Sequence, residues 1–179
     1  MIAAVVLAAG LSSRMGQPKQ IMRWGHYAMV RQVCETLIAA DVSEVVVVTG
    51  YAREKVEEAL IGCAARSVFN PGYEDGDMMR SFQIGLKTVP NSEAALFVLG
   101  DQPQMQEEVV KKVIAHWQKE KAKIVAPSFQ RRRGHPILFA REIWAHVFDV
   151  PRGASPRDFL RAHADWIHYV EVDTDSHHS

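Results

Sequence analysis

The chain has 179 residues, 47% of them hydrophobic, and its 21 Lys and Arg residues balance 21 Asp and Glu residues. A compact domain typically spans ~100–200 residues, so one domain over 1–179 with a real hydrophobic core is expected. Zero net charge argues against the broad positive surface of proteins that bind nucleic acid or anionic membranes. It does not argue against binding one small anion, because such a site needs only a few local cations.

The first half of the chain alternates between strand and helix signals. The uninterrupted apolar run Ile2–Leu7 predicts a central parallel strand covered on both faces. Later apolar residues recur with helical spacing, and short β-branched runs lie between them. The expected elements are a helix that buries Val30, Val33, Leu37 and Ile38, a strand over Val45–Val48, a short helix with Val56, Ala59 and Leu60, and a weak strand at Val68–Phe69.

The second half continues the alternation. It predicts a helix over Met78–Leu86, a strand over Ala94–Leu99, a helix that buries Val109, Val110, Val113, Ile114 and Trp117, strands over Ile124–Ala126 and Ile137–Phe139 around the basic turn Arg131–Gly134, a helix from Ser155-Pro156 to about His163, and a strand over Ile167–Val172. This order predicts a three-layer α/β/α sandwich with a mostly parallel sheet. Ligands of such sheets bind beyond the carboxyl ends of the strands, so functional residues are expected just after Leu7 and Leu99.

The first apolar run and the two cysteines bear on the cellular location of the protein. The run carries no positive segment of the signal-peptide kind, and it is far shorter than the ~20 residues needed to cross a bilayer. Cys34 and Cys63 are too few for a disulfide framework or a zinc site. We therefore expect reduced thiols in a cytoplasmic protein.

The segment Leu7–Lys19, LAAGLSSRMGQPK, has the parts of an anion-binding loop. It matches neither GxxxxGK(S/T) nor GxGxxG. Yet Gly10 and its small neighbours let backbone N–H groups approach phosphate oxygens, and Ser12 and Ser13 add hydroxyl donors. Arg14 offers a planar fork for phosphate and Lys19 a mobile point charge. The alternative from composition alone is a glycine turn with two solvated cations.

The same segment resembles the signature of the molybdenum cofactor cytidylyltransferases, within the MobA-like superfamily of nucleotidyltransferases. The resemblance implies a Rossmann-like nucleotidyltransferase fold and a loop that binds the phosphates and base of a nucleoside triphosphate. The binding residues would be Leu7, Ala8, Ala9, Gly10, Ser12 and Ser13, and the catalytic cations Arg14 and Lys19. The Ala-Ala-Gly form resembles the cytidylyl branch, so CTP is the expected nucleotide.

Asp101 follows the expected strand Ala94–Leu99 in the turn Gly-Asp-Gln-Pro. A carboxylate at that point can hold Mg²⁺, which prefers oxygen ligands and commonly takes one or two carboxylates plus substrate phosphates. By itself such an aspartate is more often a turn or capping residue. The resemblance implies that Asp101 is the metal-binding, catalytic aspartate.

A second metal carboxylate is implied near the C-terminus, where the family carries a D-(I/V)-D-T-P-E-D segment. One alignment places Asp173-Thr174 on the family's Asp-Thr and puts Glu171 at the metal position. The other makes Val170–Ser176 the preceding strand, so that the segment itself is missing. We favour the second because no Pro-Glu-Asp follows Thr174, which leaves the second ligand absent or replaced.

Two further stretches resemble the family. Asn70, with Met78, Ser81 and Gly85, implies nucleotide contacts by Asn70 and Ser81, although Asp77 stands where the family usually has glycine. The alternative is a helix N-terminal turn with a buried methionine.

Arg133-Gly134-His135-Pro136 resembles the family's RGHP, which implies acceptor binding by Gly134, His135 and Pro136. The segment Arg152–Arg157 resembles the family's GDxGAR only loosely.

The resemblance implies transfer of CMP from CTP to the phosphate of molybdopterin with Mg²⁺ as cofactor, and a molybdoenzyme of the xanthine dehydrogenase type as partner. The acceptor phosphate is already an anion, so alignment and charge neutralisation replace a general base. Three alternatives remain: another phosphate acceptor, such as a sugar phosphate or methylerythritol phosphate; a non-catalytic protein that delivers the cofactor; and a nucleotide sensor.

Overall fold

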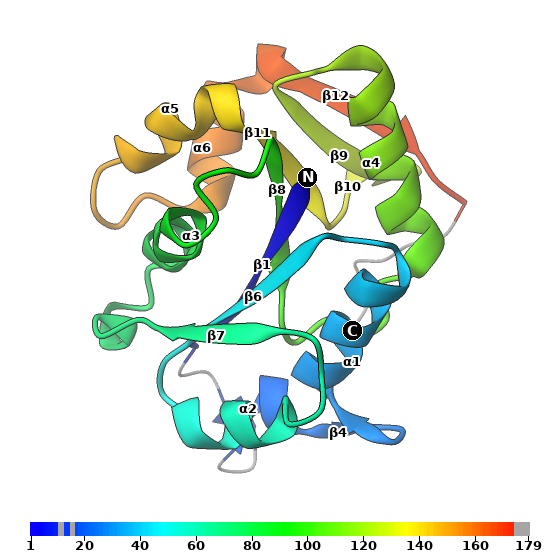
Figure 1. Ribbon diagram of the computed structural model, residues 1–179. Helices are drawn as coiled ribbons and strands as arrows, with labels where there is room; N and C mark the ends of the chain where they lie inside the picture. The colour runs from blue at the N-terminus through cyan, green and yellow to red at the C-terminus, as the bar shows by residue number, and fades with distance from the viewer. Residues whose placement is uncertain (11–12, 15–16, 174–179) are drawn as a thin grey trace.

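A mixed sheet lies between two layers of helices (Figure 1) in the computed structural model, which describes residues 1–10, 13–14 and 17–173, without the side chains of 13, 14 and 17. The sheet order is β10-β9-β11-β8-β1-β6-β7, and β12 pairs with β9. The strands are β1 (Ile2–Ala8), β6 (Glu44–Thr49), β7 (Arg66–Phe69), β8 (Ala94–Leu99), β9 (Ile124–Phe129), β10 (Arg132–Arg133), β11 (Ile137–Ala140) and β12 (Ile167–Glu171).

The prediction of a mostly parallel sheet is confirmed. Strands β7, β6, β1 and β8 run parallel to one another, and β12 runs parallel to β9. Strand β11 is antiparallel to both β8 and β9. The reversal follows from the short connection between β9 and β11, because only antiparallel strands can be joined without a long crossover.

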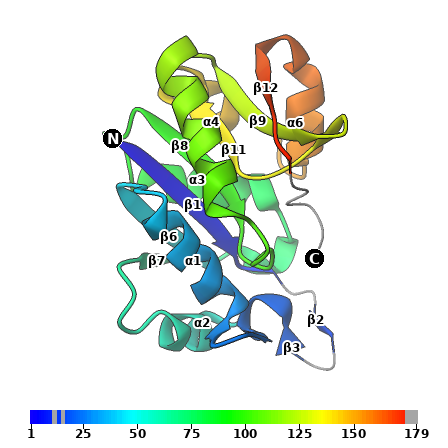
Figure 2. The same ribbon diagram turned by 90° about the vertical axis from the view of Figure 1, so that its right-hand side faces the viewer.

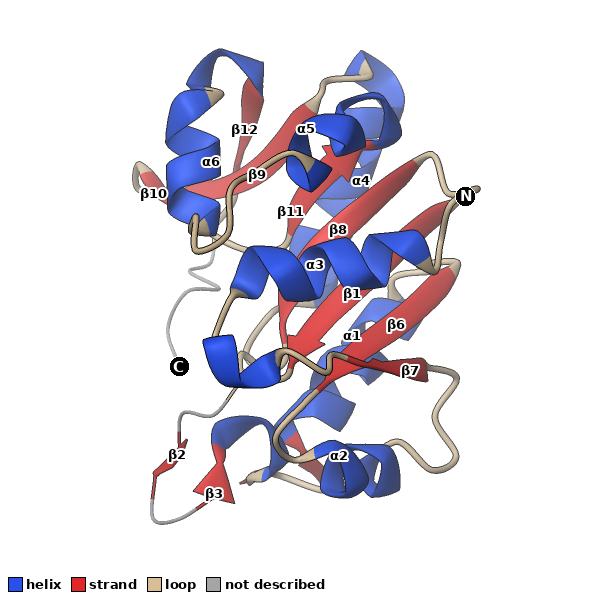
Figure 3. Cartoon of the chain, turned by 90° about the vertical axis from the view of Figure 1, so that its left-hand side faces the viewer, coloured by secondary structure: helices blue, strands red, loops and turns tan. Residues whose placement is uncertain are grey.

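Successive side chains of β1 point to opposite faces of the sheet. Because these side chains are apolar on both faces, helices cover both. Ala4 and Val6 pack with the helices α1, α2 and α4 on one face (Figure 2), and Ala3 and Val5 pack with α3, α5 and α6 on the other (Figure 3). The helices are α1 (Met29–Ala39), α2 (Arg53–Ala59), α3 (Met78–Lys87), α4 (Glu107–Glu120), α5 (Trp144–Phe148) and α6 (Pro156–Ala162). The three-layer sandwich is therefore confirmed.

Several short elements were not predicted. They are the hairpins β2 (Ser13–Arg14) with β3 (Gln17–Pro18) and β4 (Arg23–Trp24) with β5 (Tyr27–Ala28), the 3₁₀ turns η1 (Lys19–Ile21), η2 (Tyr73–Asp75), η3 (Arg141–Ile143) and η4 (Ala164–Trp166), and the helix α5. Each is too short to show a period in the sequence. Strand β9 also runs three residues past the predicted end at Ala126, through Pro127, whose missing N–H does not prevent parallel pairing with Val170. Among the described residues, no helix is both long and apolar enough to cross a membrane.

Gly85 of α3 lies directly against Val5 of β1, where a Cβ atom would overlap the Cγ1 atom of Val5. We expect Gly85→Ala to lower the free energy of unfolding by about 1–3 kcal/mol, because overpacking outweighs the ~1 kcal/mol gain in helix propensity. Urea unfolding would measure it. In a double-mutant cycle with Val5→Ala the interaction energy should be favourable, and strictly additive effects would contradict the overlap.

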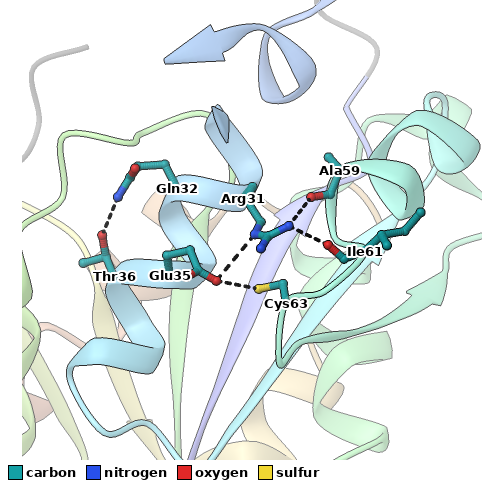
Figure 4. Close-up of polar contacts among 7 residues, drawn as sticks. All are labelled: Arg31, Gln32, Glu35, Thr36, Ala59, Ile61 and Cys63. Atoms are coloured by element: carbon teal, nitrogen blue, oxygen red, sulfur yellow. Dashed lines mark hydrogen bonds and ion pairs between the residues drawn. The ribbon is translucent and has the colours of Figure 1, made fainter. Parts of the chain in front are cut away.

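Arg31 of α1 fixes the end of α2 (Figure 4). Its Nη1 atom donates to the carbonyl oxygens of Ala59 and Ile61 at 3.1 and 2.7 Å, and its Nε atom lies 3.5 Å from Glu35 Oε1. The same Glu35 oxygen accepts from the Cys63 thiol at 3.1 Å. Arginine thus satisfies carbonyls that a helix C-terminus leaves without partners.

Cys34 and Cys63 are free thiols, the first buried in the core and the second half-buried. The Cys34 thiol donates to Cys63, and this hydrogen bond, together with burial, raises the pKa of Cys34. The same hydrogen bond lowers the pKa of Cys63, against the opposing effects of burial and Glu35. The two thiols are therefore chemically unlike.

We expect iodoacetamide to alkylate Cys63 first, with a half-maximal pH below that of an ordinary cysteine, since the thiolate is the nucleophile. Mass spectrometry of alkylation against pH would measure this. In Cys34→Ala the donor is lost, so the half-maximal pH at Cys63 should rise. An unmoved pH profile in a variant that remains folded by circular dichroism would contradict the contact.

Candidate active site

A cavity of about 160 Å³ opens where the carboxyl ends of β1 and β8 meet the segment between β7 and α3. We call it the loop cavity. Its lining residues are Leu7, Ala8, Ala9, Gly10, Gln20, Asn70, Tyr73, Gly76, Asp77, Met78, Ser81, Leu99 and Asp101. The structure thus brings together the sequence-predicted nucleotide residues Leu7, Ala8, Ala9, Gly10, Asn70 and Ser81 with Asp101.

Glycines hold the neighbouring loops close to the end of β1. The Gly100 amide donates to the Leu7 carbonyl oxygen at 2.9 Å, and a Cβ atom at Gly100 would lie 2.8 Å from that oxygen. A Cβ atom at Gly50 would lie 2.7 Å from the Ala9 carbonyl oxygen. Both distances are too short for a side chain, so residues after β6 and β8 must be glycine for the strand ends to converge here.

Gln20 anchors the base of the loop and was not predicted from the sequence. Its Nε2 atom donates to the carbonyl oxygens of Ala8 at 3.1 Å and of Gly10 at 3.4 Å, and the residue is only 5% exposed. A lone glutamine carries no motif signal, so only the fold shows its role. Lys19 begins the same 3₁₀ turn and is half-buried, but within the described part it is not among the residues that line the loop cavity.

The remaining loop residues are only partly covered by the structure. The backbone of Ser13 and Arg14 forms β2, which pairs with Gln17 and Pro18 of β3. The side chains of Ser13 and Arg14, and the whole of Ser12, lie outside the described residues. Their roles in binding and catalysis stay predictions.

Asn70 and Ser81 form a buried pair. Asn70 Nδ2 donates to Ser81 Oγ at 2.9 Å, and Asn70 Oδ1 accepts from the Gly72 amide at 2.8 Å. Both residues are nearly inaccessible, at 2% and 4% exposed. Asn70 therefore shapes the turn, whereas the Ser81 hydroxyl, as an acceptor from Asn70, keeps its own hydrogen to donate. The alternative, a helix N-terminal turn with a buried methionine, is met only in part: α3 begins at Met78, but Met78 is 39% exposed, and the buried methionine is its neighbour Met79.

Asp101 lies two residues after β8, half-buried at the edge of the loop cavity. Next to it, the Oε1 atom of Gln102 is buried without a hydrogen-bond partner among the described residues. The Asp101 carboxylate is an oxygen ligand of the kind that Mg²⁺ prefers, so this residue fits such a cation. No three His, Cys, Asp or Glu side chains converge anywhere within the described ranges, this point included. A cation at Asp101 would thus take most ligands from substrate and water.

A second, larger cavity of about 940 Å³ adjoins the first across Met78 and Leu99, which line both. We call it the arginine cavity. Its polar lining residues are Ser128, Arg131, Arg132, Arg133, His135, Ser155, Arg157, Tyr169 and Glu171. Arginine is well suited to phosphate, and Glu171 is the one carboxylate in this described lining.

In the RGHP segment, some residues line the arginine cavity and others are buried and shape the turn. The His135 ring lines the arginine cavity and stacks on Phe97, with 5.9 Å between ring centres. Gly134 and Pro136 are buried behind it, and the Gly134 amide donates to the Pro127 carbonyl oxygen at 2.8 Å. Gln130 and Arg131, with φ angles of 50° and 67°, form the tip of the hairpin, as tight hairpins require. Gly134 and Pro136 therefore shape the turn that presents His135.

Up to residue 173, where the described part of the chain ends, no second carboxylate from the chain end lines the loop cavity beside Asp101. Strand β12 ends at Glu171, and the Val172 amide donates to the Ser128 carbonyl oxygen at 2.9 Å. Glu171, the metal position in one of the two alignments, lines the arginine cavity rather than the loop cavity. Residues 174–179, with Thr174 of the family-like segment, lie outside the described residues.

Comparison with known proteins places this geometry among nucleotide-transferring enzymes. The profile of the family described as "MobA-like NTP transferase domain" matches residues 4–166. The molybdenum cofactor cytidylyltransferase of Escherichia coli (strain K12) is 25% identical over 160 residues, which cover 89% of this chain and 80% of that protein.

Solved structures share the fold over nearly the whole chain. Rv0371c from Mycobacterium tuberculosis H37Rv has a TM-score of 0.84 at 22% identity, covering 97% of this chain and 88% of that one. Its complex with manganese has a TM-score of 0.79 at 21% identity, covering 97% and 89%. A CMP:2-keto-3-deoxy-manno-octonic acid synthetase complexed with CTP has a TM-score of 0.78 at 14% identity, covering 97% and 90%. At these identities the likeness shows the fold alone.

Proposed function

Because the chain belongs to the MobA-like NTP transferase family, whose members are nucleotidyltransferases, we propose that it transfers CMP from CTP to the phosphate of molybdopterin and releases pyrophosphate. The observation that carries this proposal is the pair of adjoining cavities. One is formed by the Leu7–Gly10 backbone and Asp101, and the other is rich in arginine. Two substrates held there would meet at Met78 and Leu99, which border both cavities.

The chain's own groups supply alignment and charge neutralisation. Backbone N–H groups around Gly10 and the Ser81 hydroxyl would hold the triphosphate, and Lys19 and Arg14 would neutralise charge on its oxygens. The acceptor phosphate attacks the α-phosphorus and pyrophosphate leaves in line. The acceptor oxygen is already anionic, so no proton must be removed from it, and orientation is the main requirement.

Rv0371c, which shares this fold, has a structure in complex with manganese. Magnesium would be held by Asp101 and would supply positive charge that neutralises the triphosphate. Among the described residues, the one other carboxylate that lines the loop cavity is that of Asp77.

The arginine cavity supports a phosphorylated acceptor of moderate size. Its volume of about 940 Å³ is at the upper end of the ~300–1,000 Å³ typical of small-molecule sites. His135 and the neighbouring arginines suit an anion, and the Phe97–His135 stack gives a flat wall. These features fit a flat heterocycle with a phosphate, and the downstream partner would be a molybdoenzyme of the xanthine dehydrogenase type.

A thermal-shift panel of CTP, GTP, ATP and UTP, each with and without Mg²⁺, tests the nucleotide. A ligand at about 100 times its Kd stabilises the native state by ~2.7 kcal/mol, so CTP with Mg²⁺ should raise the melting temperature most. Pyrophosphate release is then measured with molybdopterin, a sugar phosphate and methylerythritol phosphate side by side. Release with another acceptor only would replace molybdopterin. Binding without release from any acceptor would favour the delivery protein or the nucleotide sensor.

A further inference from the structure

Asp77 stands at the junction of the two cavities, at a position where the related family usually has glycine. It is the N-cap residue of α3, and its Oδ1 atom accepts from the Arg80 amide at 3.0 Å. Its other oxygen, Oδ2, accepts from the Gly153 amide at 3.1 Å. Glycine could make neither contact through a side chain, so both depend on the carboxylate in this chain.

The second contact joins α3 to the turn that leads into α6. Gly153 has a φ angle of 88°, and within this turn the Ala154 amide makes only a local hydrogen bond, to the Pro151 carbonyl oxygen at 3.1 Å. Two residues later Ser155 begins α6 with a reciprocal capping box with Asp158. A capping box fixes the start of a helix relative to the chain before it, so an anchor at Gly153 also restrains the first turn of α6.

The two elements joined by Asp77 belong to different cavities. Asp77 lines the loop cavity, whereas Ser155, Pro156 and Arg157 line the arginine cavity. Met78, the next residue along α3, lines both. A hydrogen bond to a carboxylate is stronger than one between neutral groups, and it acts here across 76 residues of sequence.

We propose that Asp77 is a positioning residue that holds the turn 151–154 and, through it, fixes the acceptor-side wall, residues 155–157, relative to the bound nucleotide. The inference rests on the proposed two-substrate function of the adjoining cavities. It predicts that loss of the Gly153 contact loosens residues 151–157 and weakens acceptor binding, because the wall must then be ordered by the acceptor itself. Because Asp77 also lines the loop cavity, the effect on nucleotide binding is measured separately and should be the smaller of the two.

Asp77→Ser is the sharpest variant. Serine is as good an N-cap as aspartate, so the hydroxyl keeps the Arg80 contact while no second oxygen remains for Gly153. Asp75→Ser is the matched control, since Asp75 is an exposed residue two positions away and the variant loses the same charge. Asp77→Gly, which restores the family's usual residue, removes both contacts.

The Asp77–Gly153 contact can be tested without any substrate, by measuring amide hydrogen exchange of residues 149–157 with mass spectrometry. Exchange should be faster in Asp77→Ser than in wild type or Asp75→Ser. Equal exchange in all three proteins would overturn the inference, whatever the enzyme transfers.

Acceptor binding is read in two ways. With molybdopterin, KM for the acceptor should rise about 3- to 10-fold with kcat within about twofold, as expected for loss of one ordering hydrogen bond. If wild type does not turn over, the proposed function fails. Titration with inorganic phosphate then measures anion binding at the arginine cavity without any reaction. The Kd for phosphate should be higher in Asp77→Ser than in wild type, and higher in Arg157→Ala too if phosphate lies in the arginine cavity. An acceptor KM, or a phosphate Kd, equal to that of wild type would overturn the coupling even if exchange is faster.

Discussion

Asp101→Asn should lower the rate of pyrophosphate release about 10²- to 10³-fold, the range seen when one group that stabilises transition-state charge is removed. The amide has the same shape but no charge, so it holds a divalent cation poorly. The residue is half-buried, and no described residue is shown donating a hydrogen bond to its carboxylate. We therefore expect the free energy of unfolding to change little.

The measurement is turnover against Mg²⁺ concentration for wild type and Asp101→Asn. The half-saturating Mg²⁺ concentration should rise together with the loss of rate. Glu171→Gln distinguishes the two alignments of the chain end. If Glu171 is the second metal ligand, its variant will also need more Mg²⁺; if it only lines the arginine cavity, the acceptor KM will change instead. Asp75→Asn serves as the control for charge. Full turnover by Asp101→Asn would remove Asp101 from the metal site.

Lys19→Ala should lower turnover by about 10²- to 10³-fold as well, because in the proposed mechanism it removes a cation that stabilises the triphosphate in the transition state. The structure places Lys19 at the first position of η1, directly before Gln20, whose side chain is bonded to the Ala8 and Gly10 carbonyl oxygens. The lysine therefore begins from a fixed turn at the base of the loop. Its long side chain can reach a phosphate that is not in contact with its backbone.

Single-turnover rates with saturating CTP would separate loss of rate from loss of binding. Lys19→Arg, which keeps the charge, should retain more activity than Lys19→Ala. Lys112→Ala, on the exposed face of α4, controls for the loss of a positive charge and should match wild type. Unchanged circular dichroism and unfolding midpoint would show that the fold is intact. Near-normal turnover of Lys19→Ala would exclude the residue from the mechanism.

The position of the loop cavity illustrates what patterns of residues can predict. The apolar runs that became β1 and β8 were long and uninterrupted, so their ends were located to within one residue. In a parallel sheet the carboxyl ends of neighbouring strands meet at one edge. The residues after Leu7 and after Leu99 were therefore expected to lie together, and Gly10 and Asp101 do line one cavity.

Contacts between distant residues could not be predicted in the same way. Gln20 is a single polar residue without a period or a motif, and the family-like stretch around Asp77 does not show what its side chain contacts. The partners of the two residues lie up to 76 residues away. The division of the RGHP segment was also unforeseen, because the sequence does not show that Gly134 and Pro136 are buried while His135 faces a cavity. Such details depend on how loops pack on a finished sheet.

By itself the sequence determined the order of buried strands and amphipathic helices, and the residues placed at the strand ends, because hydrophobic periodicity and turn residues act locally along the chain. Only the tertiary structure decided that two cavities adjoin across Met78, that Asp77 joins their walls, and that Glu171 faces the arginine cavity. These relations are set by close packing between elements far apart in sequence, where a difference of one side chain decides which groups meet.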